Sequence, residues 1–131
     1  ESELASPRQR QRLLEKLSTG RGAVEAHLGA ALGSALLEAT GLPASDYKGR
    51  NAIRIDPEVP SLWARNLMLL RLVDCPAVLM EPYIANSRSS YVRIQKALRA
   101  REYHEPLAAD DILVEYADAV VTGVLRAYER Y

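Results

Sequence analysis

The chain has 131 residues, with 17 basic and 17 acidic side chains, so its formal net charge is zero at pH 7. This balance does not favour nucleic acid or an anionic membrane surface, and neither is expected as a partner. The length predicts one domain over residues 1–131, in which 1–21 form an N-terminal helix and a linker. The single cysteine excludes an internal disulfide and a Cys-rich zinc site. No apolar run approaches the roughly 18 residues of a membrane span, and the polar start shows no signal peptide.

Two helices are predicted in the first third of the chain. Ser6 followed by Pro7 and, at the third position, Gln9 is typical of a helix start, and the predicted helix continues to about residue 17. Residues 22–40 carry apolar side chains at spacings of three and four, which predicts an amphipathic helix. Gly41 follows as the expected C-terminal cap.

Two further helices are predicted in the last third. The serine-rich residues 87–90 precede apolar positions at helical spacing, with a basic outer face. Asp110 and Asp111 open the last helix, because acidic side chains suit the positive end of the helix dipole. Its apolar stripe continues to Tyr128.

The centre of the chain contains two short apolar runs, residues 67–73 and 76–81, separated by Asp74 and Cys75. Runs of this length, bounded by turn residues, are typical of buried strands in a central sheet. Residues 52–55 alternate between apolar and polar, and they form either a short edge strand or a plain loop. The sequence therefore predicts an α/β fold, with a short central sheet of two or three strands flanked by about four helices.

Glu81 is a lone charge at the end of the second apolar run. Catalytic groups collect at the carboxyl ends of strands in open α/β sheets. Two interpretations are open. Glu81 either belongs to a structural network, for example as a pair with Arg71, or acts as a general base.

Other chemistry is less well supported. The sequence has no glycine-rich phosphate loop, no H-E-x-x-H pair and no serine nucleophile elbow. The residues beside Cys75 offer no base that would activate it. We interpret His27 as a packed or partly exposed side chain and His104, beside Glu105, as a surface residue, so we assign no metal ligand in this chain.

Arg71, residues 76–81, Tyr83 and Asn86, taken in this order, resemble the C-terminal signature of the zinc-dependent N-acetylmuramoyl-L-alanine amidases of the Amidase_3 type. That family has a strand ending in an arginine, then a Pro-Ala-Val-Leu-Val-Glu strand, glycine, an aromatic residue, an apolar residue, serine and asparagine. The resemblance covers residues 24–131.

The resemblance implies a phosphorylase/hydrolase-like amidase fold and a peptidoglycan hydrolase of the bacterial cell envelope, periplasmic or extracellular. Glu81 corresponds to the catalytic glutamate, which activates a zinc-bound water against the amide between N-acetylmuramic acid and L-alanine. It would then protonate the leaving amine. By the same resemblance, Arg71 and Asn86 would bind or orient the substrate.

The chain also departs from the family pattern. Pro82 stands where the family has glycine, and Ala85 where it has serine. The zinc-binding motifs of the family, Gly-His-Gly-Gly and Ser-x-His-x-Asn, are not in this chain. The ligands of zinc, the implied cofactor, are therefore expected upstream, in a segment associated with this one, or the chain is a relative that has lost the metal. The alternatives are a non-catalytic amidase-like module that binds peptidoglycan or a protein, and another metal-dependent amidohydrolase on the same fold.

Overall fold

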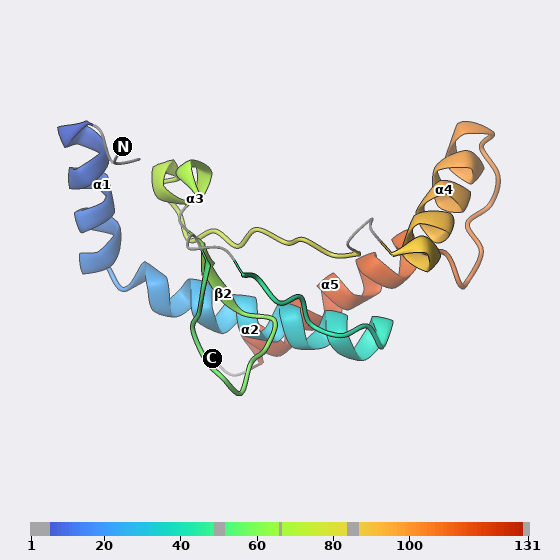
Figure 1. Ribbon diagram of the computed structural model, residues 1–131, viewed down its shortest axis with the longest axis horizontal. Coiled ribbons are helices and arrows are strands. Elements are labelled where there is room, and N and C mark those ends of the chain that lie inside the picture. Colours follow the sequence, from blue (N-terminus) through green and yellow to red (C-terminus); the bar gives the residue numbers. More distant parts are fainter. Residues whose placement is uncertain (1–5, 49–51, 66, 84–86, 130–131) are drawn as a thin grey trace.

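The computed structural model describes residues 6–48, 52–65, 67–83 and 87–129. The chain is helix-dominated, with a small two-stranded antiparallel sheet, and so belongs to the broad α/β class. Helices α2 and α5 cross at its centre, α1 and α3 lie at one end, and α4 lies at the other (Figure 1). The elements are α1 (Pro7–Ser18), α2 (Arg21–Thr40), β1 (Ala52–Arg54), β2 (Trp63–Arg65), α3 (Met68–Leu72), α4 (Arg88–Glu102) and α5 (Ile112–Tyr128).

The α2–α5 crossing is built from small residues. A Cβ atom added to Gly123 of α5 would lie 2.7 Å from Cα of Leu32 in α2, so the two backbones approach closely at this point. Leu32 and Ala119 are buried beside it. His27 Nε2 lies 3.0 Å from the carbonyl oxygen of Ala127 and links the same two helices. The interpretation of His27 as a packed or partly exposed side chain is confirmed, since it is half-buried.

The helix ends follow the expected capping chemistry. Gly41 has φ of 61° and its N–H donates to the carbonyl of Leu37, so the predicted glycine cap of α2 is confirmed. The Asp111 side chain accepts a hydrogen bond of 2.8 Å from the N–H of Leu113 at the start of α5. The four long helices lie where the sequence predicts them, to within a few residues.

The prediction of a strand at residues 67–73 is wrong. The segment forms α3, in which the N–H of Arg71 donates to the carbonyl of Leu67. Leucine and methionine, neither of which is branched at Cβ, dominate this run. They have high helix propensity, whereas strands favour β-branched side chains. Length and flanking turn residues alone therefore gave the wrong element.

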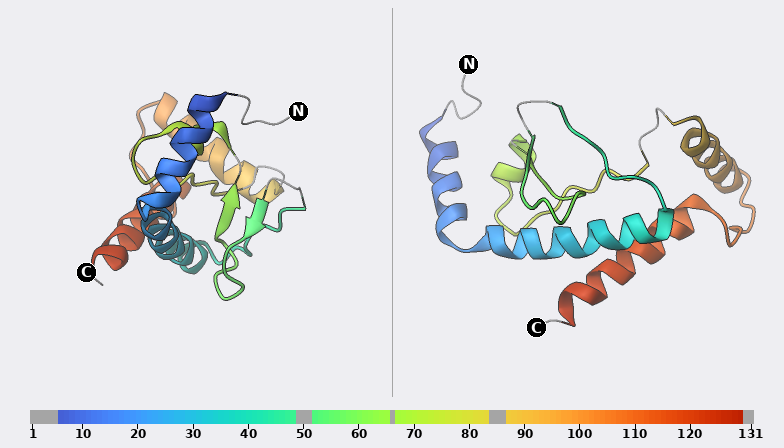
Figure 2. Two further views of the ribbon diagram at one scale, coloured as in Figure 1. Left: turned by 90° about the vertical axis from the view of Figure 1, so that its left-hand side faces the viewer. Right: turned by 60° about the horizontal axis from the view of Figure 1, so that its bottom comes forward.

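The prediction of a buried strand at residues 76–81 is also wrong. This stretch is extended, but it is not paired in a sheet with any described strand. We call residues 76–82 the strap. It runs from α3 towards α4 on the opposite side of α2 from α5 (Figures 1 and 2). A central sheet of buried strands is therefore not observed in the described part of the chain.

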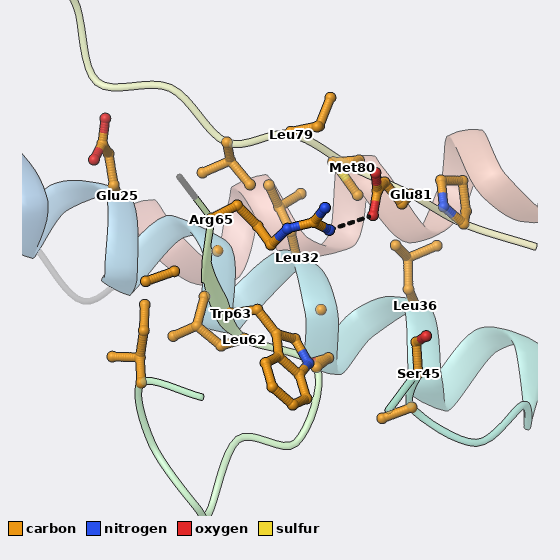
Figure 3. A pocket seen from close by; sticks show the side chains of 18 of the residues that line it. Glu25, Leu32, Leu36, Ser45, Leu62, Trp63, Arg65, Leu79, Met80 and Glu81 are labelled. Carbon is orange, nitrogen blue, oxygen red and sulfur yellow. Dashed lines mark hydrogen bonds and ion pairs between the residues drawn. The ribbon is translucent and has the colours of Figure 1, made fainter. Parts of the chain in front are cut away.

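The observed sheet is a hairpin made from the segment before α3. Strand β1 confirms the edge-strand interpretation of residues 52–55, and β2 pairs with it in the register Ala52↔Arg65, Ile53↔Ala64 and Arg54↔Trp63. In the connecting turn, Asp56 Oδ1 accepts from the N–H of Glu58 at 2.9 Å. The hairpin carries Trp63 and Arg65 into the region between the strap and α2 (Figure 3).

Candidate functional site

Glu81 lies near the end of the strap and is held by two side chains from other segments. Its Oε2 atom accepts hydrogen bonds from Arg65 Nη1, at 3.2 Å, and from the Tyr47 hydroxyl. The Glu81 side chain is 48% exposed, while that of Arg65 is 17% exposed. Figure 3 shows the guanidinium of Arg65 directed at the carboxylate. Oε1 of Glu81 has no hydrogen-bond partner among the described residues, and both of the carboxylate's hydrogen bonds named above are made by Oε2.

Aromatic and cationic side chains support this carboxylate. The Arg65 guanidinium carbon lies 4.3 Å from the centre of the Tyr47 ring, and the Tyr47 and Trp63 rings meet edge to face at 5.4 Å. The guanidinium carbon of Arg54 lies over the Trp63 ring, 4.8 Å from its centre. These contacts fix the Tyr47 hydroxyl and Arg65 before any ligand arrives.

Tyr47 stays protonated beside the carboxylate. Burial raises the pKa of its hydroxyl, and the hydrogen bond to Glu81 and the charge of Glu81 raise it further, against the opposing effect of Arg65. The hydroxyl therefore acts as a hydrogen-bond donor to Glu81 at neutral pH. Its role is to orient the carboxylate.

A cavity of about 880 Å³ opens beside Glu81, between the strap, the hairpin and α2. Its walls are mainly apolar, and Leu32, Leu36 and Met80 contribute to them (Figure 3). An open, mostly apolar cavity with a few polar groups is the usual form of a small-ligand site.

Three buried polar atoms beside this cavity have no hydrogen-bond partner in the described structure: Ser61 Oγ, Trp63 Nε1 and Arg65 Nε. Ser61 lies in the turn before β2, while Trp63 and Arg65 are two positions apart in β2 and so lie on the same face of that strand. A buried polar atom without a partner costs free energy, about 1–3 kcal/mol each. Ordered water, an ion or a ligand can supply the hydrogen bonds that such atoms need.

The residues predicted for the site separate in the structure. Arg71 is buried in α3 and lines the same cavity, but the ion pair of Glu81 is made with Arg65. The suggested Arg71–Glu81 pair is therefore replaced by an Arg65–Glu81 pair. Asn86 lies outside the described residues.

Tyr47 and Arg65 were missed by sequence reasoning. They lie 34 and 16 positions before Glu81, outside the segments in which the sequence indicated a functional residue. Recognising a strand at residues 63–65 would have placed Arg65 near the strap. Three residues are too few to show the alternation of apolar and polar side chains by which a strand is recognised.

The predicted surface position of His104 is confirmed, because it is exposed in the turn after α4. Within residues 6–48, 52–65, 67–83 and 87–129, no three His, Cys, Asp or Glu side chains lie close enough together to hold a metal ion. In the same ranges, no helix is both long and apolar enough to cross a bilayer. No protein-family model, curated protein or solved structure matches this chain.

Proposed function

We propose that this chain supplies the general base of a peptidoglycan amidase that cleaves the bond between N-acetylmuramic acid and L-alanine. One observation supports this above the others: Glu81 lies at an open cavity with one carboxylate oxygen fixed by Tyr47 and Arg65 and the other without a described partner. An oriented carboxylate with one available oxygen can accept a proton from water and pass it to a leaving amine.

The cavity supports the substrate side of this proposal. Apolar walls and the Trp63 and Tyr47 rings suit the faces of a sugar and the methyl groups of a peptide stem. Arg71 also lines the cavity and brings a positive charge to its wall. The outward position of Glu81 leaves room for the substrate, because its side chain is half exposed.

Zinc does not fit the described residues, since no set of three ligands is present among them. A metal-dependent version of this function therefore needs ligands from residues other than those described. The roles assigned to Glu81, Tyr47 and Arg65 are orientation and proton transfer, and both are performed by this chain's own atoms.

The test compares Glu81→Gln with the wild type on purified peptidoglycan, with release of new amino termini as the readout. Glutamine preserves shape and hydrogen bonding but cannot take a proton, so hydrolysis should fall by about 10²–10⁴-fold. Glu102→Gln is the matched control, because it makes the same change at an exposed position on α4, and it should retain full activity. Equal turnover in all three proteins contradicts the proposal.

A binding module is the second candidate, and the unpaired atoms of Ser61, Trp63 and Arg65 favour it. They offer hydrogen bonds to a ligand whether or not chemistry follows. In that case Glu81→Gln should bind peptidoglycan as the wild type does, while Trp63→Ala should bind it more weakly. A sedimentation assay with insoluble peptidoglycan measures both.

A further inference from the structure

The strap has the extended conformation of a strand, but it is not paired with any strand that the structure describes. The N–H of Ala77 donates to Glu25 Oε1 at 2.9 Å. The backbone groups of Val78, Leu79 and Met80 make no hydrogen bond with any residue that the structure describes. An extended, apolar segment with unpaired backbone groups is a template for pairing with another strand.

The available edge of the strap can be assigned. Val78 faces α2, with both methyl carbons 3.8 Å from the position of a Cβ on Gly29. The Leu79 side chain extends from the side of the strap that faces away from α2 (Figure 3), and it is 42% exposed. Alternate residues of an extended chain direct their backbone groups to opposite edges. Because Ala77 directs its N–H towards Glu25, Val78 and Met80 direct theirs to the other edge.

The accessible surface of the chain is larger than its mass predicts. It measures 9441 Å², whereas a compact monomer of 14.5 kDa exposes about 6,900 Å². The difference, roughly 2,500 Å², reaches the share that one subunit buries in an obligate dimer, about 1,000–2,500 Å². The net charge of zero means that two copies approach without overall repulsion.

We propose that the strap pairs with the strap of a second copy, antiparallel, about a twofold axis at Leu79. Pro76 and Pro82 lie three positions to either side of Leu79. Proline has no N–H, so each ends the ladder at the same distance from the axis, as twofold symmetry requires. Val78 of one copy and Met80 of the other form the hydrogen-bonded pairs. The two Leu79 residues face each other as a non-hydrogen-bonded pair, with Cα atoms about 4.5 Å apart.

Disulfide cross-linking tests this register directly. A Cα separation of about 4.5 Å lies within the range that a disulfide can bridge. Leu79→Cys, made in a Cys75→Ser background because Cys75 is exposed, should convert mainly to a covalent dimer when treated with diamide. Leu125→Cys in the same background is the control, since Leu125 is 56% exposed on α5, on the other side of α2 from the strap (Figure 2). Equal cross-linking of the two variants, or none at position 79, overturns the proposal.

Sedimentation velocity provides the second measurement. The wild type should sediment with twice the mass of the 14.5 kDa chain, and Leu79→Lys should shift it to the monomer by placing two like charges opposite each other. Leu125→Lys should stay dimeric. A wild type that is monomeric at every concentration overturns the proposal. None of these readouts depends on hydrolysis, so they stand apart from the proposed amidase function.

Discussion

The Glu25 carboxylate of α2 accepts a hydrogen bond of 2.9 Å from the backbone N–H of Ala77, 52 residues further along the chain. Lys16 Nζ lies 2.6 Å from the same oxygen and also donates to the carbonyl of Leu70 at 2.7 Å. Glu25 thus connects α1, α2 and the strap at one point. Because the strap carries Glu81, this contact determines where the candidate base lies.

Glu25→Ala should lower the free energy of unfolding by about 1.5–3 kcal/mol, because it removes hydrogen bonds to a charged group that is only 20% exposed. Urea denaturation followed by circular dichroism measures the change. Glu58→Ala is the control, since Glu58 is exposed in the hairpin turn, and it should change stability by less than about 0.5 kcal/mol. Equal effects of the two substitutions would show that the strap is not anchored through Glu25.

Gly123→Ala should destabilise the protein although alanine favours helices. Its new Cβ would lie 2.7 Å from Cα of Leu32, and overpacking of this kind costs about 1–3 kcal/mol. Gly22→Ala is the matched control in α2, where a Cβ meets nothing within 4 Å. That control should gain up to about 1 kcal/mol from helix propensity. Thermal unfolding of both variants should therefore show shifts of opposite sign, and shifts of the same sign would contradict the close α2–α5 approach.

The helices could be predicted because their signals are local. Gly41 needs only its own positive φ to end α2, and Asp111 needs only the N–H of Leu113 to begin α5. The strap shows the limit of such signals. Its proline and apolar residues predict an extended chain correctly, but pairing depends on a partner that no local pattern specifies.

The site was predictable only in part for the same reason. Glu81 stands out in the sequence as a lone charge after an apolar run. Its partners Tyr47 and Arg65 reach it through the hairpin, and the contacts that place them join residues far apart in the chain. Arg71 was predicted as the partner because residues 67–73 were expected to be a neighbouring strand. Because that segment is a helix, Arg71 does not lie on a strand beside Glu81.

His104 adopts φ of 54°, a left-handed conformation that costs a non-glycine residue about 1–2 kcal/mol. His104→Gly should relieve this cost but increase the entropy of the unfolded chain, leaving a net gain of about 0.5 kcal/mol. Tyr103→Gly, at φ of −95°, has no such strain to relieve and should lose about 0.5–1 kcal/mol. Denaturant titration of the pair checks the difference, and a loss of stability in His104→Gly would contradict the argument.

Glu115 makes the stability of the fold depend on pH in the acidic range. Burial acts to raise the pKa of its carboxyl, but hydrogen bonds from Arg93, at 2.9 Å, and Tyr83, also at 2.9 Å, together with the charge of Arg93, hold it below the ordinary value of 4.5. A carboxyl with a lower pKa in the folded state binds fewer protons there, so the free energy of unfolding rises with pH between the two pKa values. The contribution of Glu115 is therefore complete above pH 4.5 and is lost as the pH falls through the folded pKa.

Glu115→Gln should consequently be less stable than the wild type at pH 7, and the difference should shrink as the pH falls below 4.5. Urea denaturation at a series of pH values measures the two curves. Glu105→Gln removes the same charge from an exposed position in the turn after α4, and its curve should run parallel to that of the wild type. Since Tyr83 follows directly after the strap and donates to Glu115, a pH-independent gap between wild type and Glu115→Gln would mean that this end of the strap is held by contacts other than the carboxylate.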